Sequence, residues 1–213
     1  MMKTPLPPLP ASTRPRATRV PATERGFSLI TTLILLVVVT VLGISASQIV
    51  LLSERSSRFD RDTQIAFQAA EAALIDAELD IRGPNTSANK RVDKFSPRNF
   101  VNFIEGCGDD SVLRGMCKTA DAGQKPVWYQ VDFTDQSASA KTVKFGEFTG
   151  REFAVGTTGI RPEQAPRYII EAMPVTEAGS SATSPNLRYR ITAMGFGPRK
   201  ETQVVLQIVF QKE

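Results

Sequence analysis

The sequence predicts an α+β protein in which a long N-terminal helix packs on a C-terminal antiparallel β-sheet. Three observations predict this fold class. Residues 27–53 carry no charged side chain, residues 54–82 contain neither glycine nor proline, and segments of alternating apolar residues follow only after residue 126. The first half of the helix is apolar enough to cross a membrane, and the second half is amphipathic. The chain therefore divides into segments 1–26, 27–53, 54–82 and 83–213.

Residues 1–26 form a basic segment ahead of the helix. They hold five basic side chains and one acid, Glu24, whereas the other 187 residues hold 21 basic and 21 acidic side chains. The sequence pI of 9.2 therefore belongs to this segment and gives no support for a nucleic-acid-binding surface elsewhere. Six prolines exclude a helix here. Translation starting at Val20 from a non-standard codon would shorten the segment to seven residues.

Gly26 and Phe27 mark a predicted processing site. A basic arm, a glycine and then an apolar segment is the reverse of a secretory signal, in which the cleavage site follows a segment of about 7–15 apolar residues. A peptidase acting at the cytoplasmic face would remove residues 1–26 and leave the apolar helix on the mature chain. This order indicates a prepilin.

Residues 27–53 are predicted to cross the inner membrane once. As a helix they extend about 40 Å, which exceeds a hydrocarbon core of about 30 Å. The basic residues before them place the N-terminal end in the cytoplasm and everything after Ser53 in the periplasm. The same segment could also anchor a periplasmic binding or enzymatic domain, which is the alternative from another functional class.

Residues 54–82 continue the helix with an apolar stripe at spacings of three and four residues. Gly83-Pro84 ends the helix, because glycine adopts the left-handed cap and proline cannot continue. A helix unbroken from 27 to 82 differs from an ordinary anchor, which a flexible linker joins to its domain. Three acidic side chains lie near the end of the helix, at Asp76, Glu78 and Asp80. They predict a solvated face of the helix or, alternatively, a contact with another subunit. The predicted stripe consists of Phe67, Ala70, Leu74, Ala77 and Ile81.

The region 83–213 predicts a sheet of three or four antiparallel strands. Small alanine side chains in the second half of the helix allow the sheet to approach it closely, so that each element buries one face. Turn-rich connections are expected at 174–185 and 195–200. The segments with strand character are 127–133, 167–173, 187–193 and 203–210, with weaker candidates at 143–148 and 152–155.

Cys107 and Cys117 are the only cysteines, and in an extracytoplasmic compartment they predict a disulfide. Closing such a short loop contributes ~2–3 kcal/mol. The chain has no histidine, which excludes Ser-His and Cys-His catalysis and the common zinc sites. Asp109-Asp110 with Asp121 could hold calcium, although a solvated loop is favoured because the EF-hand spacing is missing. We therefore expect no catalytic residue, no cofactor and no metal, and a protein that is not an enzyme.

The residues around the processing site resemble those of type IV pilins. Arg25-Gly26-Phe27-Ser28-Leu29 is similar to the type III prepilin signal, and residues 37–47 and 66–74 resemble the N-terminal region of PilX-type minor pilins. Tyr189 to Ala193, followed by Gly195-Phe196-Gly197, is similar to the last hairpin of that family.

This resemblance implies the type IV pilin fold and a non-enzymatic, structural role. It implies that prepilin peptidase cleaves after Gly26 and methylates the amine of Phe27. The mature subunit would leave the inner membrane for an extracellular pilus, contacting the major pilin and other minor pilins through its helix. It would prime pilus assembly and, with other minor pilins, carry a tip adhesin. A minor pseudopilin of a type II secretion system is the alternative.

Thr31 departs from the pilin pattern. Most pilins have glutamate as the fifth mature residue, where it neutralises the N-terminal amine of a neighbouring subunit inside the apolar filament core. Threonine forms hydrogen bonds but cannot cancel a charge. The K pseudopilin of type II secretion systems also lacks the glutamate. We therefore expect this subunit at a filament end, at or near the tip; the alternative is that the fifth position simply tolerates threonine.

Overall fold

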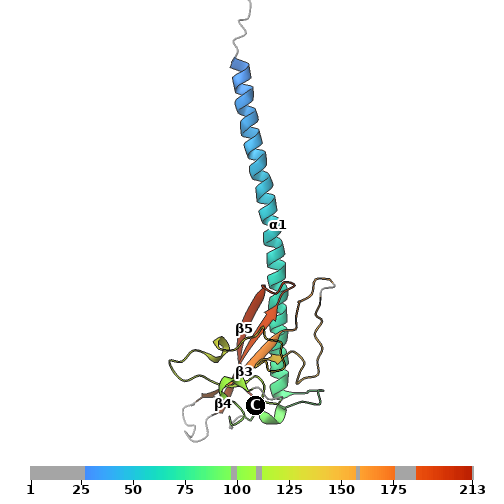
Figure 1. Cartoon of the computed structure of the whole chain (residues 1–213), viewed down its shortest axis with the longest axis vertical. Helices are drawn as coiled ribbons and strands as arrows, with labels where there is room; N and C mark the ends of the chain where they lie inside the picture. The colour runs from blue at the N-terminus through green and yellow to red at the C-terminus, as the bar shows by residue number, and fades with distance from the viewer. Residues whose placement is uncertain (1–26, 97–99, 109–111, 157–158, 176–185, 213) are drawn as a thin grey trace, which may run out of the picture. The chain divides into compact units, whose positions relative to one another are not determined.

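The computed structural model describes residues 27–96, 100–108, 112–156, 159–175 and 186–212 (Figure 1). Its regular elements, besides three short 3₁₀ turns, are α1 (Phe27–Arg82), β1 (Met116–Lys118), β2 (Val143–Lys144), β3 (Arg167–Val175), β4 (Asn186–Phe196) and β5 (Gln203–Phe210). The predicted α+β fold, with a long N-terminal helix and a sheet packed on part of it, is confirmed.

The chain forms two compact units, Met1–Leu51 and Leu52–Glu213. The described part of the first unit is the N-terminal portion of α1. Its large apolar side chains are exposed along the helix, from Leu29 at 73% to Val50 at 58%. Such a surface is not stable in water, so this part of α1 needs an apolar environment from lipid or from other subunits.

The second unit begins with the remainder of α1, which buries a stripe of small side chains. Phe67, predicted to lie within the stripe, is 37% exposed, because the stripe is centred on the neighbouring alanines instead. The helix ends at Arg82, as predicted. Gly83 follows with φ +76° and its backbone N–H donates to the carbonyl of Leu79, 2.7 Å away. The buried stripe consists of Ala66, Ala69, Ala70, Ala73, Leu74, Ala77 and Ile81.

The sheet has five strands in the order β1-β3-β4-β5, with β2 also paired to β3. Strands β3, β4 and β5 form an antiparallel meander in which Ile170 pairs with Ile191 and Ile191 with Ile208. Strand β1 runs parallel to β3, with Met116 beside Ile170. The expectation of a purely antiparallel sheet is therefore wrong at this edge. Strand β1 comes from the region after α1 and pairs with β3 at the edge of the sheet. No tight hairpin connects β1 to β3, and such a hairpin would require antiparallel pairing.

Gly195 of β4 lies directly against α1. A Cβ atom at this position would overlap the carbonyl oxygen of Ala66 and the backbone nitrogen of Ala70. Alternate residues of β3 and β4 on this face form the main core with the helix stripe, including Tyr168, Ile170, Tyr189 and Ile191. The alanines therefore act as predicted, since they let the sheet reach the helix backbone.

Three predicted strand segments differ in the structure. Residues 127–133 contain a 3₁₀ turn over Val127–Tyr129 and no strand. Pro126 starts this turn, because the N–H of Tyr129 donates to its carbonyl at 2.9 Å. Only residues 143–144 of the segment 143–148 form a strand, and 152–155 forms none. Beyond β3, most of the predicted connection 174–185 lies outside the described residues, and β4 extends two residues into the predicted turn 195–200.

Candidate functional site: the apolar helix and the loops fastened to the sheet

The predicted processing site lies at the N-terminal end of α1. Gly26 falls outside the described residues, and Phe27 is the first residue of the helix. Among the described residues one helix is long and apolar enough to cross a membrane, and it is α1. Its first turn contains no acidic residue.

Thr31 lies in this helix with an exposed side chain. Its hydroxyl donates to the backbone carbonyl of Ser28 at 3.1 Å. The next residue, Thr32, makes the same kind of bond at 2.9 Å. Hydroxyls that bond to their own helix can enter an apolar environment at low cost. Position 31 therefore offers a hydroxyl already engaged with the helix, and no carboxylate.

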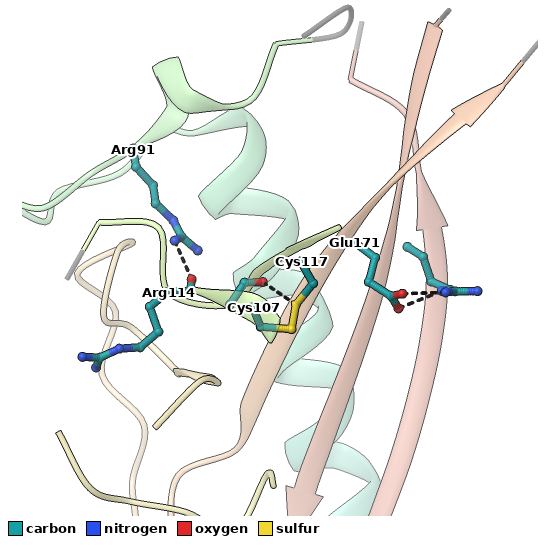
Figure 2. The surroundings of a disulfide bond; sticks show 7 residues. Arg91, Cys107, Arg114, Cys117 and Glu171 are labelled. Atoms are coloured by element: carbon teal, nitrogen blue, oxygen red, sulfur yellow. Dashed lines mark hydrogen bonds and ion pairs between the residues drawn. A yellow bond between two sulfur atoms is a disulfide. The ribbon is translucent and has the colours of Figure 1, made fainter. Parts of the chain in front are cut away.

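Cys107 and Cys117 form the predicted disulfide (Figure 2). Both residues are fully buried and pack with Val127, Phe133 and Ile169 on the side of the sheet away from α1. Cys117 belongs to β1 and lies beside Glu171 of β3, so the disulfide joins the loop around residue 107 to the sheet. It fixes a segment that has little regular structure of its own.

The proposed calcium ligands receive no support from the described residues. Asp109 and Asp110 lie outside them, and Asp121 is exposed. Within the described ranges there is no group of three or more side chains suited to holding a metal ion.

Asp80 and Arg91 form a buried ion pair between the end of α1 and the loop that follows it. Nη2 of Arg91 lies 2.7 Å from Oδ2 of Asp80, and both side chains are fully buried. Nη1 of the same guanidinium donates to the carbonyl of Val112 at 2.8 Å and to that of Arg114 at 2.7 Å, and Figure 2 draws the second of these bonds. The hydroxyl of Tyr168 in β3 donates to Asp80 at 3.1 Å. One charged pair thus connects the helix, two loops and the sheet.

Asp76, one helical turn earlier, fastens a second loop. Its carboxylate accepts hydrogen bonds from the backbone N–H of Gly146 at 2.8 Å and from the hydroxyl of Thr149 at 2.5 Å. Arg151 lies 3.8 Å away. Burial raises the pKa of Asp76 above its ordinary value, against the lowering effect of these partners.

The expectation of a solvated or subunit-contacting acidic face is therefore wrong for Asp76 and Asp80. Both are fully buried within this chain, whereas Glu78 is half-buried. The sequence carried a signal for this arrangement, because positions 76 and 80 flank Ala77 and Ile81 on the stripe that was predicted to face the sheet. Arg91 was missed altogether, since a lone arginine in a polar loop has no local pattern that indicates burial.

Glu171 and Arg190 form a third charged pair on the side of the sheet away from α1. Nε and Nη2 of Arg190 lie 2.9 and 2.6 Å from the two carboxylate oxygens, so the pair is bidentate (Figure 2). Glu171 is fully buried next to the disulfide, and Arg190 is partly exposed. This pair therefore joins β3 to β4 on the face where the disulfide holds its loop.

Two parts of the chain match known protein families. Residues 25–74 match the PilX N-terminal family, and residues 113–212 match the family described as type IV pilus assembly protein PilX C-term. The first match covers the apolar helix and its start, and the second covers all five strands.

The chain belongs to the PilX family. It is a minor pilin of type IV pili, and PilX proteins are structural subunits. The apolar helix and the family together indicate membrane anchoring and association with the pilus. No curated protein and no solved structure gives a significant match to the chain.

The segment between the two PilX matches, residues 75–112, contains the two buried aspartates, Arg91 and Cys107. Their partners Tyr168 and Cys117 lie inside the matched C-terminal part. In this PilX protein the unmatched segment is therefore attached to the sheet by the hydrogen bond between Tyr168 and Asp80 and by the disulfide.

Proposed function

We propose that this PilX protein primes type IV pilus assembly and occupies a position at or near the pilus tip, together with other minor pilins and a tip adhesin. The observation that carries the proposal is Thr31, the fifth residue after Gly26. Its hydroxyl bonds to Ser28 within its own helix and supplies no negative charge.

A tip position minimises the cost of an unpaired charge in an apolar core. In a filament of helices each N-terminal amine lies close to the fifth residue of an adjacent mature subunit, so an interior subunit both gives and receives this pairing. A subunit with Thr31 can present its amine to a neighbour's glutamate but cannot neutralise an incoming amine. A buried unpaired charge is strongly unfavourable. The loss is smallest where the receiving side is vacant, which is the condition at the tip.

Processing is part of the proposal. Prepilin peptidase is proposed to remove residues 1–26 and methylate Phe27, leaving 27–53 as the membrane and filament-core segment. Residues 54–82 then form the amphipathic half of the helix and 83–213 the periplasmic domain. Before assembly the subunit spans the inner membrane once, with its C-terminus in the periplasm. The basic leader and the uncharged length of the following helix support this orientation.

The fastened loops suit a subunit that presents a preformed surface to other minor pilins and to an adhesin. Loops held by a disulfide and buried ion pairs lose little conformational entropy when a partner binds. In this protein the disulfide holds a loop on one side of β3, and the ion pair of Arg91 with Asp80 holds loops on the other.

Labelling of sheared pili tests the proposed location. An epitope at the C-terminus of the wild-type protein should be found at a single end of each filament, and deletion of the gene should reduce filament number more than filament length. Thr31→Glu is the informative variant, because a carboxylate at the fifth position should allow the subunit to enter the shaft as well.

Wild-type label distributed along the shaft would contradict the tip location. Loss of protein secretion with unchanged surface pili would favour a secretion pseudopilin.

A further inference from the structure

Four arginines line one open pocket in the second unit of the chain. The pocket has a volume of about 660 Å³, within the range of about 300–1,000 Å³ typical of small-ligand sites. It lies between α1 and the turn that connects β4 with β5. We call it the arginine pocket, and its principal lining residues are Arg55, Arg58, Phe59, Arg61, Asp62 and Arg199.

The arginine pocket has an excess of positive charge. Its one acidic lining residue, Asp62, is nearly buried, with 7% of its side chain exposed. The carboxylate is already shared between Arg61 at 3.2 Å and Arg199 at 3.1 Å. Arg55 and Arg58 are exposed, and their charges remain for a ligand.

The arginines on α1 outnumber the acids that lie beside them in the pocket. Arg55, Arg58 and Arg61 follow one another at intervals of three on the same face of α1, and like charges at this spacing destabilise a helix. Glu54 and Asp60 are also exposed on α1, but neither lines the pocket. An anionic ligand would remove the repulsion among the arginines.

The position of the pocket along the chain indicates the kind of anion. Arg55 and Arg58 follow Ser53, the last residue of the uncharged segment, by about 3 and 8 Å along the helix axis. The headgroup layer on each side of a bilayer is about 5–8 Å thick. Basic residues this close to a membrane segment are disfavoured on the translocated side, so their presence there calls for a compensating partner.

We propose that the arginine pocket binds the phosphate of an anionic phospholipid in the periplasmic leaflet while the subunit is still in the inner membrane. Guanidinium groups recognise phosphate oxygens in a bidentate manner, which ammonium groups do not. Phe59, 57% exposed among the arginines, provides an apolar surface for the adjoining acyl region. The proposal goes beyond the function proposed above and requires only that residues 27–53 cross the membrane.

Native mass spectrometry of the full chain released from detergent micelles tests this binding. The micelles contain equal amounts of phosphatidylglycerol and phosphatidylethanolamine, and the measured quantity is the ratio of the two lipids that remain bound. The test variant is Arg55→Gln/Arg58→Gln, which leaves Arg199 and its bond to Asp62 intact. The control is Lys90→Gln/Arg161→Gln, which removes the same charge from two exposed residues outside the pocket. The basic leader is common to all three proteins.

The wild type and the control should retain more phosphatidylglycerol than phosphatidylethanolamine. The test variant should lower the ratio of the two lipids about thirtyfold, as expected when two arginines near an anionic surface are lost. Equal retention of both lipids by the wild type would overturn the proposal, as would an unchanged ratio in the test variant. If the test variant keeps its lipid ratio but no longer co-purifies with other pilins, the pocket binds an acidic protein surface and not a lipid.

Discussion

The guanidinium of Arg91 and the carboxylate of Asp80 are both fully buried, and Nε of Arg91 lies 3.1 Å from each carboxylate oxygen. The ring centroid of Phe148 lies 3.6 Å from the same guanidinium. This pair is the point at which the helix, the following loops and β3 meet, and its removal has a predictable cost.

Arg91→Met should lower the free energy of unfolding by about 3–5 kcal/mol, because it leaves the buried carboxylate of Asp80 without its counter-charge. Fluorescence of Trp128, the only tryptophan, reports the unfolding of the full chain in detergent micelles. Lys90→Met, at the neighbouring position, is the matched control. The side chain of Lys90 is exposed, so its replacement should change the free energy of unfolding by less than about 0.5 kcal/mol. Equal stability of Arg91→Met and the control would show that the ion pair does not hold the fold.

Asp76 should make stability depend on pH in the direction opposite to most carboxylates. Burial raises its folded-state pKa above the ordinary value of 3.8, so the folded state binds the proton more tightly than the unfolded state. Its contribution to stability is therefore largest at low pH and is lost as pH rises through the folded pKa. The measurement is the difference in unfolding free energy between wild type and Asp76→Asn at a series of pH values, which cancels the other titrating groups. This difference should fall as pH rises from about 4 and become constant above the folded pKa; a difference that rises would contradict the assignment.

Gly195→Ala should destabilise the domain by about 1–3 kcal/mol, because the added methyl group would overlap the backbone of α1 at Ala66 and Ala70. Gly43→Ala is the matched control, as no atom lies within 4 Å of the position its Cβ would occupy. Tryptophan fluorescence during denaturation gives the midpoint of unfolding of each variant. An unchanged midpoint for Gly195→Ala would mean that β4 does not approach the helix closely.

The disulfide should stabilise the second unit substantially. Cys107→Ser is expected to lower the free energy of unfolding by ~2–4 kcal/mol, since it releases the loop and leaves a polar atom among the buried side chains of Val127, Phe133 and Ile169. Mass spectrometry without reductant should detect the peptide pair linked through Cys107 and Cys117. Two thiols that react with an alkylating agent in protein taken from the periplasm would be inconsistent with this structure.

Regular periodicity accounts for the parts of the fold that the sequence predicted well. The end of α1 at Arg82 and the strand Gln203–Phe210 match the predicted bounds, because a Gly-Pro stop and an apolar residue at every second position are local signals. Residues 127–133 alternate equally well but form a turn. Pro126 starts that turn. Its alternating apolar residues are Val127, Tyr129, Val131 and Phe133, and of these only Val127 and Phe133 are buried. Alternation over so short a segment does not distinguish a strand from a turn that buries two side chains.

The partners of the buried charges could not be predicted from local pattern, because most of them lie far away in the sequence. Asp80 is bonded to Arg91 and to Tyr168, the latter 88 positions away, and Asp76 to Thr149, 73 positions away. The parallel pairing of β1 was also missed for lack of a local pattern. This strand has only three residues in a polar region, and so short a segment carries no strand signal of its own. Thr31, in contrast, was identified from its position relative to Gly26, and its role remains a prediction.

N-terminal mass spectrometry of the protein isolated from pili tests the central claim most directly. Prepilin processing predicts a mature chain that starts at Phe27 with a methylated amine and lacks residues 1–26. The Gly26→Arg variant serves as the control, because a large charged residue before the scissile bond should leave the unprocessed precursor in the inner membrane. A functional wild-type protein that retains residues 1–26 would contradict the claim that this chain is a processed pilus subunit.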